Sequence, residues 1–319
     1  MSDLNRVVVI AGGLSPEREV SLRSGARVTD ALRRTGVEVE LRDVDKDLLP
    51  ALAQDPPGVV WPVLHGIAGE DGAIKEVLEL AGVPYVGARP HACRTAFDKT
   101  TAKAVLQRAG LLTPESVTLP KEAFHDLGAA ELTARIVDRL GPELFVKPRA
   151  GGSAFGVSRV ELAEQLPQAL MACFGYHDEA LIERRVTGTE IAVGVADPGD
   201  GPRALPVVEI VADGLYDYTA RYTPGKVEFH CPARLPDQVA QEAARVAVAA
   251  HTALGLLDLS RTDAIVTGAG EVFVLETNVA PGMTETSTYP MALSEAGLDF
   301  GVFCRDLAAQ AAHRHSTPA

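Results

Sequence analysis

Cysteine is scarce in this chain, and its spacing favours neither disulfide bonds nor a zinc site. The four cysteines are Cys93, Cys173, Cys231 and Cys304. None belongs to a CxxC pair or stands near a histidine at the spacing of zinc ligands. Because unpaired thiols are typical of reducing compartments, we expect four free thiols and a cytoplasmic protein.

Long hydrophobic runs and long basic runs are also missing. The first residues, MSDLNRVVVIAGG, hold an apolar run of only four residues before Ala11, too short for a signal-peptide core or a membrane span. The net charge of −13 comes without a basic cluster, which argues against binding nucleic acid by phosphate neutralisation. We therefore expect neither a membrane nor a nucleic acid as partner, and we interpret the acidity as an aid to solubility.

What is present suits a globular protein of two or three domains that share a large core. The chain has 319 residues, of which 46% are apolar and 23% charged. At the start, the strand-like run 7–10 leads into a glycine turn and then a helix. Ser15 is the expected N-cap and Pro16 the first helical residue, and the helix should end at Arg34. Further alternation up to Arg89 predicts a doubly wound open parallel sheet.

The remainder of the chain reads as two further units of mixed α/β and α+β structure. We place the first boundary near residue 89 and the second near residue 186, which gives units 1–89, 90–186 and 187–319. No linker of low complexity separates them, so we expect tight packing with a site between them. Helices are predicted over 98–108, 129–140, 162–174, 237–254 and 300–311, and strands over 37–41, 59–64, 83–86, 117–119, 145–147, 157–160, 180–185, 190–195, 204–211, 264–266 and 272–276.

A hairpin near the C-terminus is predicted to carry a metal site. If Gly268–Glu271 forms a four-residue loop, Thr267 pairs with Val272, and the same register places Asp263 opposite Glu276. Alternation along the strand puts Asn278 on the face of Glu276. Two carboxylates and an amide suit Mg²⁺, although the same spacing is equally typical of a polar strand end.

A glycine-rich loop, Lys147–Gly156, leaves one predicted strand and enters another. Its small residues would let backbone amides approach a phosphate, and Lys147 would add a positive charge. The loop matches neither the Walker A pattern nor GxGxxG, so a flexible hairpin is an open alternative.

Three other features are ambiguous when taken one at a time. Glu17, in the predicted first turn of a helix, has a simple explanation in the helix dipole. His65 and Gly66 follow a buried strand, at the place where open α/β sheets bind ligands, but a lone histidine is more often structural. Asp213–Phe229 contains three tyrosines and no long apolar run, which indicates a long loop of the kind that covers active sites.

Taken in order, these motifs resemble the D-alanine–D-alanine ligases of the ATP-grasp superfamily. The resemblance extends from about Arg6 to Leu307. It implies an ATP-grasp fold, α/β and α+β, with a Rossmann-like N-terminal domain at 1–89, a central ATP-grasp domain at 90–186 and a C-terminal one at 187–319. The motifs are GGLSPEREVS (12–21), LHGIAGEDG (64–72), FDK (97–99), the loop 147–156, IERRVTGTE (182–190), YDYTARY (216–222), RTD (261–263) and LETNVAPGMTETS (275–287).

The resemblance also implies a reaction and a role for each matching residue. A carboxylate attacks the γ-phosphate of ATP, and an amine of a second amino acid then displaces phosphate from the acylphosphate. The implied ATP-binding residues are Lys99, Lys147, Glu183, Val186, Glu190 and Arg221, and the implied ligands of two Mg²⁺ ions, with Mn²⁺ as a substitute, are Asp263, Glu276 and Asn278. Glu17, Ser153, Tyr222 and Arg261 are the implied catalytic residues, and His65, Gly282 and Ser287 would bind the amino acids.

This sequence departs from the family pattern at several places. Arg221 stands where a lysine is usual, Ala154 where a second serine is usual, and Lys75 and Glu76 in place of a Gln-Gly pair. Thr288 and Tyr289 follow Ser287 where aliphatic residues are usual. The resemblance implies that the enzyme joins two D-alanines for peptidoglycan precursors. The departures leave open a related ligase with a different donor or acceptor in a secondary pathway. A nucleotide-binding module without ligase activity is a third alternative. The resemblance further implies a homodimer, without an interface.

Overall fold

The computed structural model describes residue 4 and residues 6–212 and 227–316. The N-terminal part holds a parallel three-stranded sheet in the order β2–β1–β3. The predicted strand at 83–86 is wrong, because Tyr85 makes only an isolated bridge to Val60. The N-terminal elements are β1 (Arg6–Ala11), α1 (Arg18–Arg34), β2 (Glu38–Asp43), α2 (Leu48–Gln54), β3 (Val59–Pro62), α3 (Ile67–Glu70) and α4 (Ala73–Leu80).

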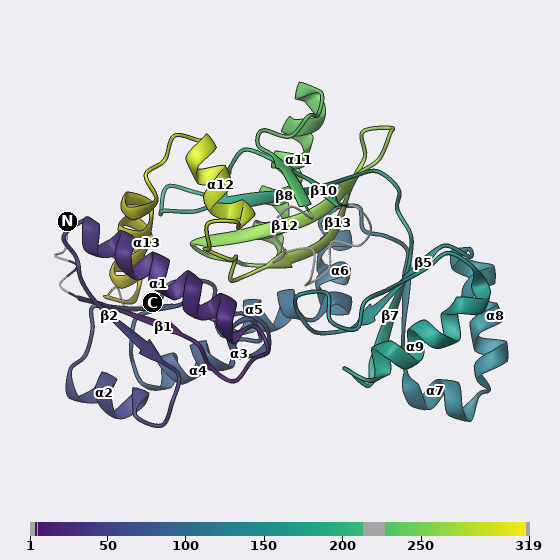
Figure 1. The fold of residues 1–319 in the computed structure, drawn as a ribbon, viewed down its shortest axis with the longest axis horizontal. Helices are drawn as coiled ribbons and strands as arrows, with labels where there is room; N and C mark the ends of the chain where they lie inside the picture. Colours follow the sequence, from purple (N-terminus) through teal and green to yellow (C-terminus); the bar gives the residue numbers. More distant parts are fainter. Residues whose placement is uncertain (1–3, 5, 213–226, 317–319) are drawn as a thin grey trace.

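A second, antiparallel sheet of four strands lies at the opposite end of the molecule from the parallel sheet (Figure 1). Its order is β4–β7–β5–β6, and helices α8 and α9 contribute Ile136, Leu140, Leu166 and Leu170 to the core beneath it. The elements from residue 90 to this sheet are α5 (Pro90–Phe97), α6 (Lys99–Arg108), β4 (Ser116–Pro120), α7 (Lys121–Asp126), α8 (Ala129–Leu140), β5 (Leu144–Pro148), β6 (Ser158–Val160), η1 (Ala163–Gln165), α9 (Leu166–Phe174) and β7 (Glu179–Arg184).

The third sheet, in the middle of the molecule, is antiparallel in the order β11–β10–β8–β12–β13, with β9 paired to β8 (Figure 1). Val227–Phe229, predicted as part of a long loop, belongs to β11. Pro206 interrupts the predicted strand at 204–211, because proline has no N–H for the ladder. The elements are β8 (Thr189–Ala196), β9 (Arg203–Ala204), β10 (Val208–Ala212), β11 (Val227–His230), α11 (Asp237–Ala253), β12 (Leu259–Val266), β13 (Val272–Asn278), α12 (Thr288–Glu295) and α13 (Phe300–Ser316).

The last helix returns to the N-terminal sheet rather than ending near residue 311. In α13, Leu307 and Ala311 are fully buried in one cluster with Val28 and Leu32 of α1 and Trp61 of β3. This cluster also holds residues of β8, β10 and β12. The two ends of the chain therefore share one hydrophobic core, and the core joins the parallel sheet to the central sheet.

Candidate active site

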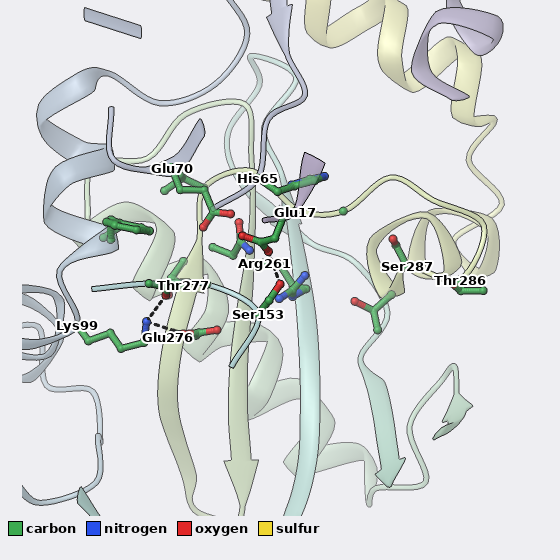
Figure 2. A pocket seen from close by; sticks show the side chains of 18 residues that line it. Glu17, His65, Glu70, Lys99, Ser153, Arg261, Glu276, Thr277, Thr286 and Ser287 are labelled. Carbon is green, nitrogen blue, oxygen red and sulfur yellow. Dashed lines mark hydrogen bonds and ion pairs between the residues drawn. The ribbon is translucent and has the colours of Figure 1, made fainter. Parts of the chain in front are cut away.

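Two neighbouring cavities contain most of the residues that the sequence singled out. The larger, of about 540 Å³, lies between the sheet of β5 and β7 and the central sheet, a size typical of small-molecule sites. The smaller, of about 70 Å³, lies between the N-terminal part and the central sheet (Figure 2). The larger is lined by Lys99, Lys147, Glu183, Val186, Glu190, Asp263 and Glu276, and the smaller by Glu17, His65, Lys99, Ser153, Arg261, Glu276, Asn278, Gly282 and Ser287, among others.

The two cavities share Lys99, Glu276 and the glycines Gly151 and Gly152. Lys99 Nζ donates to the Gly151 carbonyl at 2.7 Å and lies 3.2 Å from Glu276 Oε2 (Figure 2). These residues come from α6, β13 and the loop after β5. A basic group, an acidic group and the backbone of a glycine pair therefore lie where the contents of the two cavities would meet.

The predicted hairpin forms, but the predicted register at its turn is wrong. Val266, not Thr267, pairs with Val272, so the connecting loop is one residue longer than expected. A register shift between Asp263 and Ala264 takes up the difference, and Asp263 is opposite Glu276. The bulge follows from the extra residue in β13, Leu275. A bulge beside a candidate site is common, because it redirects a side chain.

The candidate metal ligands are held by cationic and backbone groups in this structure. Asp263 accepts two hydrogen bonds of 2.7 Å from the Arg261 guanidinium. Glu276 pairs with Lys99, and Asn278 Oδ1 accepts from the Ala280 amide at 2.8 Å. Two carboxylates and an amide oxygen form a donor set that fits Mg²⁺. Asp263 faces the larger cavity, Asn278 the smaller, and Glu276 both.

The glycine-rich loop contacts Glu17, which the sequence pattern predicts to lie in the first turn of a helix. Ser153 Oγ donates a hydrogen bond to Glu17 Oε1 (Figure 2). Ser153 and Ala154 have φ of 48° and 56°, an uncommon conformation for residues other than glycine that accompanies functional constraints. The helix begins at Arg18, with Glu17 as N-cap and without a capping contact from its side chain. The predicted start at Pro16 is wrong, because Ser15 Oγ instead accepts the Glu17 amide in a tight turn.

His65 is a buried neutral histidine that holds a neighbouring loop. Its Nδ1 lies 3.1 Å from the Ala280 carbonyl, so this nitrogen donates. Its Nε2 lies 3.3 Å from Ser24 Oγ, which also accepts the Met283 amide at 3.2 Å. Burial lowers the pKa of His65 to about 4. The ring therefore positions the segment 280–283, which carries Gly282, as a hydrogen-bonding group rather than as a charge.

Glu70 is a residue of the smaller cavity that the sequence analysis did not select, although it lies in the motif around His65. It is 8% exposed, and its Oε1 accepts the Gly66 amide at 2.9 Å. Burial, and then the neighbouring Glu17 carboxylate, raise the pKa of Glu70 to about 8. Its carboxyl group is therefore protonated at neutral pH.

We expect Glu70→Gln to become more stable relative to the unaltered protein as the pH rises. In the folded protein Glu70 keeps its proton from its ordinary pKa of 4.5 up to about 8. The stability that this proton contributes is complete below pH 4.5 and is lost as the pH rises through 8. Between pH 5 and pH 8.5 the difference in the free energy of unfolding should shift by ~1–3 kcal/mol in favour of the variant.

Urea unfolding followed by circular dichroism at several pH values measures this shift. Glu122→Gln, an exposed position on α7, is the matched control and should give a constant difference. A difference for Glu70→Gln that does not vary with pH would show that this carboxyl group is ionised throughout the range.

The segment after β13 brings backbone and hydroxyl groups to the smaller cavity. Ser287 Oγ accepts the Thr284 amide at 3.1 Å, and a Cβ added at Gly282 would lie 2.8 Å from that oxygen. Thr288 lines the cavity. Tyr289 does not: it is 1% exposed and its hydroxyl donates to the Val195 carbonyl, so this departure from the family pattern lies in the core.

Other departures from the family pattern have different surroundings. Ala154 lines the larger cavity. Lys75 is buried with its Nζ 3.3 Å from Cys93 Sγ, and Glu76 pairs with Arg94 on the surface. Arg221 and Tyr222 lie outside the described residues, as does most of the predicted loop 213–229.

Comparisons with known proteins agree with this arrangement. The family model "D-ala D-ala ligase C-terminus" matches residues 105–308, and "D-ala D-ala ligase N-terminus" matches residues 48–88. The chain is 39% identical to the D-alanine–D-alanine ligase of Bordetella avium, over 98% of this chain and 97% of that one. It is 40% identical to the ligase of Geobacter sulfurreducens, over 92% and 90% of the two chains.

Solved structures show the same fold. A D-alanine–D-alanine ligase from Bacillus anthracis superposes with a TM-score of 0.84 at 28% identity, over 98% of this chain and 99% of that one. The VanG D-Ala:D-Ser ligase from Enterococcus faecalis superposes with a TM-score of 0.82 at 28% identity, over 96% and 99%. The fold is therefore the ATP-grasp fold of these enzymes, and the chain belongs to the D-alanine–D-alanine ligase family.

Proposed function

We propose that this protein joins two D-alanine molecules at the expense of ATP, releasing ADP and phosphate, for the synthesis of peptidoglycan precursors. The observation that carries the proposal is the meeting of the two cavities at Lys99, Glu276 and the glycine pair 151–152. A nucleotide in the larger cavity would place its terminal phosphate at this junction. A small amino acid in the smaller cavity would reach the same place with its carboxylate.

In the larger cavity, the chain provides cations for the phosphates and a strand end for the base. Lys147 and Lys99 lie on the side of the glycine-rich loop, Val186 lies in the connection between β7 and β8, and Glu190 lies near the start of β8. Phosphoryl transfer is catalysed mainly by positioning and by neutralising charge, which lysines provide. We assign Glu183 to the support of Lys147, because its carboxylate is 2% exposed and paired with it.

Mg²⁺ would be bound by Asp263, Glu276 and Asn278, and it supplies charge neutralisation on the phosphates. We infer two ions, with Mn²⁺ as a substitute. The pairs Arg261–Asp263 and Lys99–Glu276 are cation–carboxylate contacts, so a bound cation would take over the carboxylates and leave the two basic side chains for anionic oxygens.

In the smaller cavity, the chain orients the amino acids and the developing negative charge. Glu17, held by Ser153, would accept the ammonium group of the first D-alanine. The carboxylate of this first D-alanine would attack the γ-phosphate of ATP, which forms an acylphosphate and releases ADP. The amine of the second D-alanine would then displace phosphate from the acylphosphate. Arg261 and the Gly282 amide would stabilise the oxyanion of that step. Ser287 and His65 would border the amino acids, and Arg221 and Tyr222 are proposed to complete the site.

The proposal also covers the compartment, the oligomeric state and the domain organisation of the protein. The described part of the chain has no helix long and apolar enough to span a membrane. Among the described residues, the cysteines are free thiols. We infer that the reaction takes place in the cytoplasm with small amino acids, and that the protein is a homodimer, which sedimentation analysis would measure. The division at residues 89 and 186 is proposed as its domain organisation.

Phosphate release in the presence of ATP, Mg²⁺ and D-alanine tests the function. We expect release that depends on D-alanine and a dipeptide product detected by mass spectrometry. D-Serine as acceptor is the second candidate, because the hydroxyl-bearing residues Thr286, Ser287 and Thr288 line the smaller cavity. A mixture of both amino acids shows which acceptor is preferred. ATP binding without phosphate release with any amino acid would refute the ligase function.

A further inference from the structure

Lys103 is a buried basic residue that lies behind the larger cavity and does not line it. It stands one helical turn after Lys99 on α6, so the two side chains share a face of the helix. Its side chain is 6% exposed. Its Nζ donates to the Pro114 carbonyl at 2.7 Å and to Glu183 Oε1 at 2.5 Å.

Glu183, on β7, lies between two ammonium groups. Its Oε1 pairs with Lys103 and its Oε2 pairs with Lys147, each at 2.5 Å. The carboxylate is 2% exposed, so water does not share in its solvation. Burial would raise its pKa, but Lys147 and Lys103 together lower the pKa below its ordinary value. Burial lowers the pKa of Lys103, and the Glu183 carboxylate opposes that shift. With both lysines protonated, the three groups carry two positive charges and one negative charge, a net charge of plus one.

Of the two lysines, Lys147 faces the larger cavity. If Glu183 had only Lys147 as a partner, the two charges would cancel within a buried pair. A phosphate would then have to compete with a carboxylate for the same ammonium group, in surroundings where charge interactions are strong. Lys103 pairs with one oxygen of Glu183, so the carboxylate is shared between two lysines, of which Lys147 lines the cavity.

We propose that Lys103 is a positioning residue for nucleotide binding, which neutralises Glu183 and thereby leaves Lys147 able to bind a polyphosphate. This role deepens the proposed function and rests on its nucleotide site. Lys103 acts through Glu183 and touches neither the nucleotide nor the amino acids. Lys103→Met therefore should weaken the binding of phosphate groups far more than the binding of the base and ribose.

Calorimetric titration of the full chain with ATP and Mg²⁺, without amino acids, tests the proposal. We expect Lys103→Met to raise the Kd for ATP at least about tenfold and the Kd for adenosine less than about twofold. A structural defect would weaken both ligands alike. Lys121→Met, which removes an exposed lysine paired with Asp178, is the control and should leave both constants unchanged. Equal losses for ATP and adenosine, or no loss for ATP, would overturn the proposal.

The double variant Lys103→Met/Glu183→Gln provides an independent readout and a second chance to fold. It removes the carboxylate that Lys103 neutralises, and exchanging both members of a buried pair is often tolerated. Because the double variant lacks the buried carboxylate that competes for Lys147, we expect its Kd for ATP to be at least about threefold lower than that of Lys103→Met. A Kd for ATP as high as that of Lys103→Met would show that Lys103 does not act through Glu183. If only the double variant folds, a Kd for ATP tens of times higher than that of the unaltered protein would show the same.

The outcome is separable from that of the proposed function. If the unaltered protein binds ATP but releases no phosphate with amino acids, the ligase function fails while the titrations still decide the role of Lys103. If the unaltered protein does not bind ATP, both proposals are overturned.

Discussion

Glu276→Ala is expected to lower kcat for D-alanine ligation by about a hundredfold to a thousandfold. Glu276 is the residue of the candidate metal set that lines both cavities, and it pairs with Lys99 at 3.2 Å. The substitution removes a carboxylate ligand of the proposed Mg²⁺ ions. Without this ligand the ions would be held less well, so their positioning and charge neutralisation of the phosphates would be lost. Steady-state phosphate release at saturating ATP and D-alanine measures the effect.

Glu271→Ala is the matched control for this substitution. Glu271 lies in the connecting loop of the same hairpin and is exposed. Glu271→Ala removes the same charge from the protein without changing the cavities, so kcat should remain within about twofold of the value for the unaltered protein. Near-normal turnover of Glu276→Ala at saturating Mg²⁺ would mean that Glu276 is not a ligand of a required metal ion.

Arg261→Lys is expected to lower kcat by about a hundredfold or more while changing the Kd for ATP little. Arg261 lines the smaller cavity but not the larger one, and its guanidinium donates to both oxygens of Asp263. Lysine keeps the charge but lacks the planar guanidinium fork, so it cannot direct two N–H groups toward an oxyanion in the same way. The loss should therefore appear in the chemical step, and single-turnover kinetics would separate it from nucleotide binding.

Arg245→Lys on α11 is the control for the same change. Arg245 donates to both oxygens of Glu242 with similar geometry, but the pair lies on the surface. Because exposed pairs contribute little, neither kcat nor stability should change appreciably. Equal kcat values for Arg261→Lys and the unaltered protein would remove Arg261 from the proposed oxyanion site.

Local sequence patterns predict some helices and the hairpin well. Helices with clear periodicity and end signals, such as α8 and α11, begin where predicted and end within one residue of the expected position. Asp98, predicted as the first residue of a helix, is instead the N-cap of α6 and accepts a hydrogen bond from the Thr101 amide. The hairpin was predicted as an element, and its turn was misread by one residue because pairing energies near a glycine turn differ little between registers.

Contacts between distant segments were beyond such reasoning. The pairing of Glu183 with Lys103 joins residues 80 positions apart, and the burial of Glu70 and Tyr289 depends on elements from other parts of the chain. The residue types alone do not show whether these side chains are buried or exposed. The start of α1 was misplaced for a similar reason, since Glu17 is part of a tight turn beside the glycine-rich loop.

By itself, the sequence determined most of the strongly periodic helices and strands, the hairpin and the set of polar residues, because backbone preferences and hydrophobic periodicity act over a few neighbouring residues. Shorter elements such as α7, α12 and β11 were not predicted. Only the tertiary structure decided which charges are buried together, since desolvation and pairing depend on every element around a group. That is why Glu70 holds its proton, why Glu183 does not, and why the two cavities meet at Lys99 and Glu276.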